Sequence, residues 1–291
     1  MKNTQDEGLF KSPAPSATGD GERVVPTMRT RFHVPQVALP VLPADVLNRL
    51  RDLKDPGSRP EAWTWEKINS TNASFRVRGP QGSWVVKRSR DPAKDRLVAA
   101  LFRAWAVPTF AIDDLADGWL AMQDLARPTL RQYLLTSMPT PGLVRALGVV
   151  AAQADAVGMR DRKTSNILVD SRGAGGVCLT QIDYEGAFRV GLFTRAVRPA
   201  HYLAYLIRRL LLDVFARARQ GVADAEAYAV FAEGLREEAS RLTEAMASQP
   251  RWDGLSTRQR IILHTRVCAR SNLSSLLDRG LARAQRKGPR P

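Results

Sequence analysis

Three polar residues in the middle of the chain have side chains and spacing that suit phosphoryl transfer. Asp161 is followed by four residues and then Asn166, and Asp183 lies further downstream. The reaction needs oxygen ligands for a Mg²⁺ ion, together with one carboxylate that orients the attacking hydroxyl group and accepts its proton. We therefore take Asn166 and Asp183 as candidate metal ligands and Asp161 as the candidate base.

The segments around these residues predict a hairpin that brings them together. Asn166 opens the apolar run 167–169, which is typical of a short buried strand. Residues 170–176 carry the glycines that a tight turn requires, and a return strand leads to Asp183. The alternative is a surface loop in which Asp and Asn serve only as turn formers.

This order of residues resembles the catalytic loop and metal-binding hairpin of the protein-kinase-like superfamily. Two positions depart from the family pattern. Met159 stands where the catalytic loop usually begins with His, and Tyr184-Glu185 replaces the usual Phe-Gly after the metal-binding Asp. The second departure is common among atypical and small-molecule kinases, so the resemblance favours these over a standard regulated protein kinase.

The upstream part of the chain supplies a candidate lysine. Two strands are expected between residues 63 and 77, and the turn 79–82 leads into a third strand that ends at Lys87. In the resembled family, a lysine at this place reaches the ATP phosphates. We therefore expect Lys87 to contact phosphate.

The turn between the first two of these strands contains no glycine, although a glycine-rich loop is usual there in the resembled family. Ser70 and Thr71 could donate hydrogen bonds to the phosphates instead. A plain polar hairpin turn is the alternative.

A helix is expected over residues 93–105, and in the resembled family this helix carries a carboxylate that holds the lysine by an ion pair. Asp95 is the only acid in the stretch, so it is the candidate partner of Lys87. The other interpretation is a charge in the first turn, favoured there by the helix dipole.

The chain continues with a strand over 119–122, a short polar link and a helix, which is the arrangement that joins the two lobes in the resembled family. Adenine would stack beside this link and hydrogen-bond to its backbone around Gln123, Asp124 and Leu125. The ordered set of motifs, over residues 63–215, is most similar to bacterial kinases of the lipopolysaccharide-core sugar family and to the aminoglycoside-phosphotransferase-like branch.

The resemblance implies an α+β class: a bilobal protein-kinase-like fold with a small antiparallel β-sheet N-lobe and a mostly helical C-lobe. Helical periodicity is found in the stretches 143–158, 201–219, 223–246, 256–269 and 272–286. The expected domains are a disordered basic leader rich in Pro and Ser (1–36), the N-lobe and hinge (37–125), the helical C-lobe with the catalytic loop and metal-binding hairpin (126–287), and a tail (288–291).

Composition limits the partners. The chain has 44 Lys and Arg against 29 Asp and Glu, a net charge of +15. A basic face could dock an anionic acceptor, which would be a small molecule, a glycolipid such as lipopolysaccharide core, or a protein, and could touch an acidic membrane surface. Nucleic acid is not expected as a partner, because no helix-turn-helix, zinc finger or aromatic stacking motif is found and aromatic residues make up only 7% of the chain.

Two cysteines imply no disulfide framework, and residues 1–36 contain no apolar run long enough for a signal peptide or a membrane span. We therefore expect a cytoplasmic protein, with a place at the periphery of the inner membrane as one variant of that expectation. The leader leaves a secreted bacterial effector open as well.

Together these features predict a kinase that uses ATP and Mg²⁺ to phosphorylate an acceptor hydroxyl. Arg162 or Lys163, close to the candidate base, would neutralise the charge that builds up on the transferred group. A protein Ser/Thr kinase and a catalytically weak pseudokinase scaffold are the alternatives.

Overall fold

The structure is a computed structural model of the 291-residue chain. It describes Ala44, Asn48 and residues 63–69, 73–80, 82–160, 163–173, 176–188, 199–248, 255–270 and 272–287. The predicted leader and the tail after residue 287 lie outside the described residues. So do four of the predicted site residues: Ser70, Thr71, Asp161 and Arg162.

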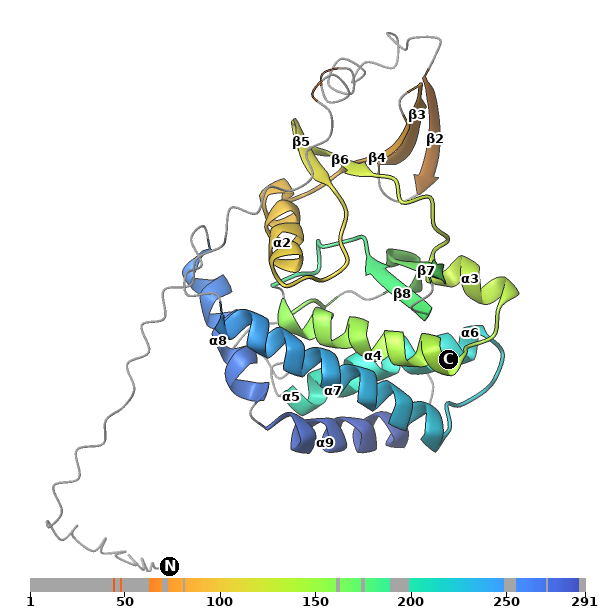
Figure 1. Cartoon of the computed structure of the whole chain (residues 1–291), viewed down its shortest axis with the longest axis vertical. Coiled ribbons are helices and arrows are strands. Elements are labelled where there is room, and N and C mark those ends of the chain that lie inside the picture. Colours follow the sequence, from red (N-terminus) through yellow and green to blue (C-terminus); the bar gives the residue numbers. More distant parts are fainter. Residues whose placement is uncertain are drawn as a thin grey trace, which may run out of the picture. The chain divides into compact units, whose positions relative to one another are not determined.

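The first part of the fold is a five-stranded antiparallel sheet with one helix beside it (Figure 1). Its elements are β2 (Thr64–Asn69), β3 (Ser74–Gly79), β4 (Gly82–Arg88), α2 (Pro92–Ala104), β5 (Ile112–Ala116) and β6 (Trp119–Gln123). The strands lie in the order β2-β3-β4-β6-β5, so β4 is central and bonds to β3 and β6. The sheet therefore surrounds Lys87, near the end of β4, with neighbours on both sides.

Alternation along β4 decides which way Lys87 points. Trp84 and Val86 are buried on one face of the sheet, in a small apolar cluster that includes Val77 of β3. Side chains of successive strand residues leave opposite faces. Val85 and Lys87 therefore share the other face, on which Val85 packs against the main core.

Local signals also determine where α2 begins and which of its faces is buried. The carboxylate of Asp91 accepts a hydrogen bond from the backbone N–H of Lys94, and a proline follows the cap as the first helical residue. The helix buries Asp95, Val98, Ala99, Leu101 and Phe102, which recur at helical spacing. Asp95 thus lies on the apolar, inward face and is fully buried (0% exposed).

The rest of the described chain is mostly helical, with one two-stranded hairpin. Its elements are α3 (Leu130–Thr136), α4 (Pro141–Ala156), a short 3-10 turn (Thr164–Asn166), β7 (Ile167–Gly173), β8 (Gly176–Gln181), α5 (Pro199–Ile207), a π-helical segment (Arg208–Leu212), α6 (Asp213–Arg217), α7 (Ala225–Ala247), α8 (Thr257–Arg270) and α9 (Leu273–Arg286). The predicted helix 201–219 is therefore interrupted by a π-helical segment. The strand β5 was not predicted.

Helices α4 and α7 lie side by side and make close backbone contact (Figure 1). A Cβ atom added at Gly148 of α4 would overlap the carbonyl oxygen of Phe231 and lie 2.7 Å from the backbone nitrogen of Leu235. A Cβ at Gly234 of α7 would in turn overlap the carbonyl oxygen of Arg145. Each helix thus needs a residue without a side chain where the other crosses it.

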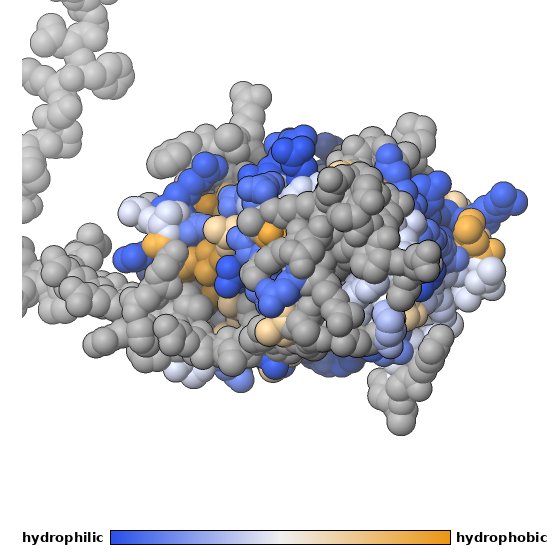
Figure 2. Space-filling view, turned by 90° about the horizontal axis from the view of Figure 1, so that it is seen from above, coloured by the Kyte–Doolittle hydropathy of each residue, from blue (hydrophilic) through white to orange (hydrophobic). Residues whose placement is uncertain are grey.

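The predicted α+β fold, with an antiparallel sheet in one lobe and a mostly helical second lobe, is confirmed. None of the helices in the described part of the chain is long and apolar enough to cross a membrane. On the face shown in Figure 2, hydrophilic side chains cover much of the described surface, with smaller apolar areas between them.

The contact between α4 and α7 leads to a stability prediction. We expect Gly148→Ala to lower the free energy of unfolding by about 2–3 kcal/mol, because the new methyl group forces two backbones apart. Gly142→Ala in the same helix is the control. That position is exposed, and the added atom would lie 3.9 Å from Thr140 Oγ1, so the better helix propensity of Ala should stabilise by up to about 1 kcal/mol. Urea denaturation of both variants measures these changes in stability. Equal unfolding midpoints for Gly148→Ala and Gly142→Ala would contradict the close contact between α4 and α7.

Candidate functional site

Lys87 is the centre of a charged cluster built from three elements. Its ammonium nitrogen lies 3.3 Å from Asp95 Oδ2 and 3.5 Å from Asp183 Oδ1. Lys87 comes from β4, Asp95 from α2, and Asp183 from the segment that follows β8. The fold therefore brings together three residues that were predicted from separate motifs. Lys87 and Asp183 are 96 residues apart in the sequence.

Asp95 also forms a hydrogen bond with Ser89, a residue that the sequence analysis did not predict. The buried hydroxyl of Ser89 donates to Asp95 Oδ2 at 2.8 Å and accepts from the backbone N–H of Asp91 at 3.1 Å. The other carboxylate oxygen, Oδ1, is buried and accepts no hydrogen bond from the described residues. The negative charge of Asp95 is therefore directed towards Lys87 and Ser89. The only signal for Ser89 in the sequence was its place just before the helix cap.

Asp183 is the point where the hairpin meets this cluster. Asp183 Oδ1 accepts from the backbone N–H of Glu185, and Oδ2 accepts from Asn166 Nδ2, each at 3.2 Å. The hairpin provides the juxtaposition, because the backbone N–H of Ile182 donates to Asn166 O at 3.0 Å. The buried Gln181, a second residue that was missed, donates to Asp183 O at 3.0 Å.

The donor set of Asp183 and Asn166 fits a magnesium ion. Mg²⁺ prefers oxygen ligands and commonly takes one or two from protein, with the rest from water and phosphate. Among the described residues no group of three or more His, Cys, Asp or Glu side chains could form a fuller cage. The amide of Asn166 turns its nitrogen towards Asp183, and a half-turn of this amide would present its oxygen there instead.

Tyr184, one of the departures from the family pattern, is packed in an aromatic pocket. Its ring stacks on Phe110, with centroids 5.5 Å apart, and meets Phe102 of α2 edge to face at the same distance. The phenol oxygen lies 3.0 Å from Thr109 Oγ1. The residue after Asp183 thus fastens this part of the chain to α2 and to the segment that follows α2.

The segment that leads to the predicted base is held at its last described residue. The backbone N–H of Arg160 donates to Gly186 O at 3.0 Å, and its carbonyl accepts from the hydroxyl of Tyr205 at 2.6 Å. The carbonyl of the preceding Met159 accepts from the hydroxyl of Tyr202. Two tyrosines of α5, neither of them predicted, therefore fix the approach to the loop. On the far side of the loop, Lys163 is exposed.

The predicted adenine link is anchored to the sheet. Asp124 accepts from Arg76 Nε at 2.8 Å and from Ser83 Oγ at 2.7 Å. Burial acts to raise the pKa of Asp124, but hydrogen bonds from Ser83 and Ala126 and the charge of Arg76 hold it below its usual range. The backbone N–H groups of the link are also engaged, since Gln123 donates to Ala111 O and Asp124 donates to Ser83 O. A base at the link would therefore have to bond to groups other than these two N–H groups. Leu125, the third predicted position, is half-buried beside the main core.

Many solved structures are similar to this chain, including the following two kinases. The Rio2 kinase from Chaetomium thermophilum, in an ADP/Mg²⁺-phosphoaspartate complex, is 17% identical with a TM-score of 0.41, covering 78% of this chain and 74% of that one. The ethanolamine kinase of Plasmodium vivax is 9% identical with a TM-score of 0.41, covering 83% and 85%. No model of a known protein family and no characterised protein matches the sequence.

The cluster predicts a measurable change in the pKa of Lys87. Burial acts to lower this pKa, but the carboxylates of Asp183 and Asp95 outweigh burial and raise it above the usual value. Asp95→Asn should therefore lower the pKa of Lys87. Competitive acylation of lysines across a pH series, read by mass spectrometry, gives this pKa as the midpoint of the labelling curve.

The control for this measurement is Glu66→Gln, which removes a carboxylate from β2, where it pairs with Arg76 and Arg78. An equal midpoint in wild type and Asp95→Asn would show that the ion pair is absent in solution. The raised pKa also determines the direction in which the free energy of unfolding changes with pH. The contribution of the charged Lys87 is complete below the pKa of an unfolded lysine, about 10.4, and falls as the pH rises through the folded value.

Proposed function

We propose that this chain is a phosphotransferase that uses ATP and Mg²⁺ to phosphorylate an acceptor hydroxyl. The observation that carries the proposal is the position of Lys87, which contacts a fully buried carboxylate on one side and a half-buried one beside Asn166 on the other. A lysine with only a structural role would be satisfied by one carboxylate. It would not need a second carboxylate that is itself hydrogen-bonded to an amide side chain. A nucleotide site needs a cation for the phosphates next to oxygen ligands for a metal.

Each residue of the cluster then has a distinct task. Lys87 would contact the ATP phosphates, and Asp95 would keep its ammonium group in place while Ser89 holds Asp95. Asp183 and Asn166 would hold Mg²⁺, which when bound neutralises charge on the phosphates. Asp161 would orient the acceptor hydroxyl and take its proton, with Arg162 or Lys163 facing the charge on the transferred group.

For the acceptor we propose an anionic sugar or glycolipid such as lipopolysaccharide core. Support comes from cations beside the loop of the predicted base. Arg160 comes just before this loop and Lys163 within it, and both are exposed. The charge of the whole chain, +15, has the same sign. Such cations would attract a negatively charged acceptor towards the site. This choice also agrees with the resemblance of the motifs to lipopolysaccharide-core sugar kinases and the aminoglycoside-phosphotransferase-like branch.

The test is transfer of radiolabel from ATP labelled at the γ-phosphate. The purified chain is incubated with Mg²⁺ and, in parallel, a lipopolysaccharide and membrane-lipid extract, a cell lysate, or no acceptor. We expect label in the first fraction. Asp161→Asn should lower the rate by about 10²–10⁴, the usual contribution of a general base, and Asp183→Ala should abolish transfer with little loss of fold.

Asp278→Asn is the matched control, since it removes an exposed carboxylate from α9. Label on protein in place of lipid would overturn the proposed acceptor and establish a protein kinase. Nucleotide binding without transfer to any fraction would make the chain a pseudokinase. Full activity of Asp183→Ala would show that the metal assignment is wrong.

A further inference from the structure

The helix that carries Asp95 is tied to other parts of the fold at both of its ends. At its first turn, Lys94 Nζ donates to the carbonyl oxygen of Glu185 at 2.9 Å. Just past its last turn, the carbonyl of Trp105 accepts from Arg241 of α7. Neither contact belongs to the cluster around Lys87, yet each restricts where α2 can lie.

The tie at the end of α2 is rigid because the guanidinium is itself held. Arg241 donates through two other nitrogens to the carboxylate of Glu238, at 2.7 and 2.6 Å. Glu238 is buried and also accepts from Gln153 of α4 at 3.0 Å. A cation bound by two hydrogen bonds to one carboxylate has a fixed orientation. The end of α2 therefore stays in place whatever happens at its start.

The tie at the start of α2 connects the two halves of the charged cluster. Lys94 is the neighbour of Asp95 in the chain, and Glu185 lies two residues after Asp183. The backbone N–H of Glu185 donates to Asp183 Oδ1 while its carbonyl accepts from Lys94. Glu185 is thus held from both sides, and the distance between Asp95 and Asp183 is constrained by a contact that does not pass through Lys87.

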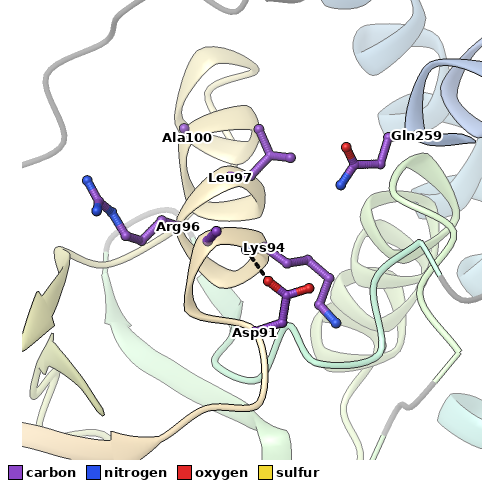
Figure 3. Close-up of a pocket in the computed structure, with 7 residues that line it drawn as sticks. Asp91, Lys94, Arg96, Leu97, Ala100 and Gln259 are labelled. Carbon is purple, nitrogen blue, oxygen red and sulfur yellow. Dashed lines mark hydrogen bonds between the residues drawn. The ribbon is translucent and has the colours of Figure 1, made fainter. Parts of the chain in front are cut away.

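The surroundings of Lys94 make it suitable for substitution. Its side chain runs past Asp91 along an open pocket of about 440 Å³ between α2 and Gln259 of α8 (Figure 3). Leu97 points to the same side, whereas Arg96 points away from Gln259. Because the lysine stem borders open space, an uncharged chain of similar length would leave no cavity in the core.

We infer that Lys94 is a positioning residue, which holds the segment after Asp183 against α2 so that Asp95, Lys87 and Asp183 stay assembled without a ligand. Its effect on catalysis rests on the proposed phosphotransfer, but the tie itself does not. Lys94 touches none of the reacting groups and acts only through the carbonyl of Glu185.

The test compares Lys94→Met and Lys94→Arg in the full chain, with Arg96→Met as the control for loss of a charge from the same helix. Hydrogen exchange by mass spectrometry reads the tie directly. In Lys94→Met we expect faster exchange in peptides that cover residues 183–188. Exchange around Trp105 should stay at the wild-type rate, because Arg241 still holds the helix there. Lys94→Arg can still donate to the carbonyl and should restore the slow exchange.

Kinetics give the second measurement. Lys94→Met should lower kcat by about ten- to a hundredfold, the size of one hydrogen bond to a charged group, with a smaller change in the KM for ATP. Unchanged exchange would overturn the tie. Faster exchange with wild-type kcat would overturn the positioning role. If wild type transfers no phosphate, the proposed function has failed, and the exchange experiment still decides whether Lys94 holds this segment.

Discussion

A single ammonium group, shared by two carboxylates, is the interaction on which the site depends. Asp95 has no exposed surface, and a buried carboxylate is stable as an anion only if a cation or hydrogen bonds compensate the lost hydration. Lys87 and Ser89 provide that compensation. Removing one partner of a buried pair typically costs about 3–5 kcal/mol. Because the carboxylates come from α2 and from the end of the hairpin, the same ion pairs also connect the sheet to both.

Uncharged contacts also support this cluster, around Asp183 and in the segment before the predicted base. Tyr184 lies between two phenylalanines, one of them on α2, and its hydroxyl contacts Thr109. Tyr202 and Tyr205 hold the carbonyls that precede the predicted base. The departures from the family pattern therefore coincide with well-packed positions: Met159 and Tyr184 are both buried. The Tyr-Glu pair after Asp183 joins that residue to α2.

Sequence reasoning could predict those parts of the site that depend on local patterns. The spacing of Asn166 and Asp183 around a glycine-containing turn predicts a hairpin, and the apolar run that follows the turn 79–82 predicts a strand ending at Lys87. Both segments are strands in the structure. The strand β5 was not predicted because its sequence, with Asp113 and Asp114 in the middle, has little strand propensity. Its strand conformation depends on pairing with β6. The hydrogen bonds from Lys94 and Arg241 to backbone carbonyls were not predicted for another reason. Lys94 and its partner Glu185 lie 91 residues apart, and Arg241 and its partner Trp105 lie 136 apart. No local pattern encodes contacts at such separations.

The crossing of α4 and α7 has a further consequence for how the fold tolerates change. Where side chains meet, rotamers and small shifts can absorb a substitution, but at Gly148 and Gly234 the two backbones meet directly. The helix that leads to Met159 and Arg160 therefore takes its position from main-chain atoms, which every amino acid shares. Many apolar residues around this core could be exchanged for others of similar volume without moving the segment that leads to the predicted base. Those two positions leave no such freedom, so the geometry here depends on the absence of side chains more than on the identity of any that are present.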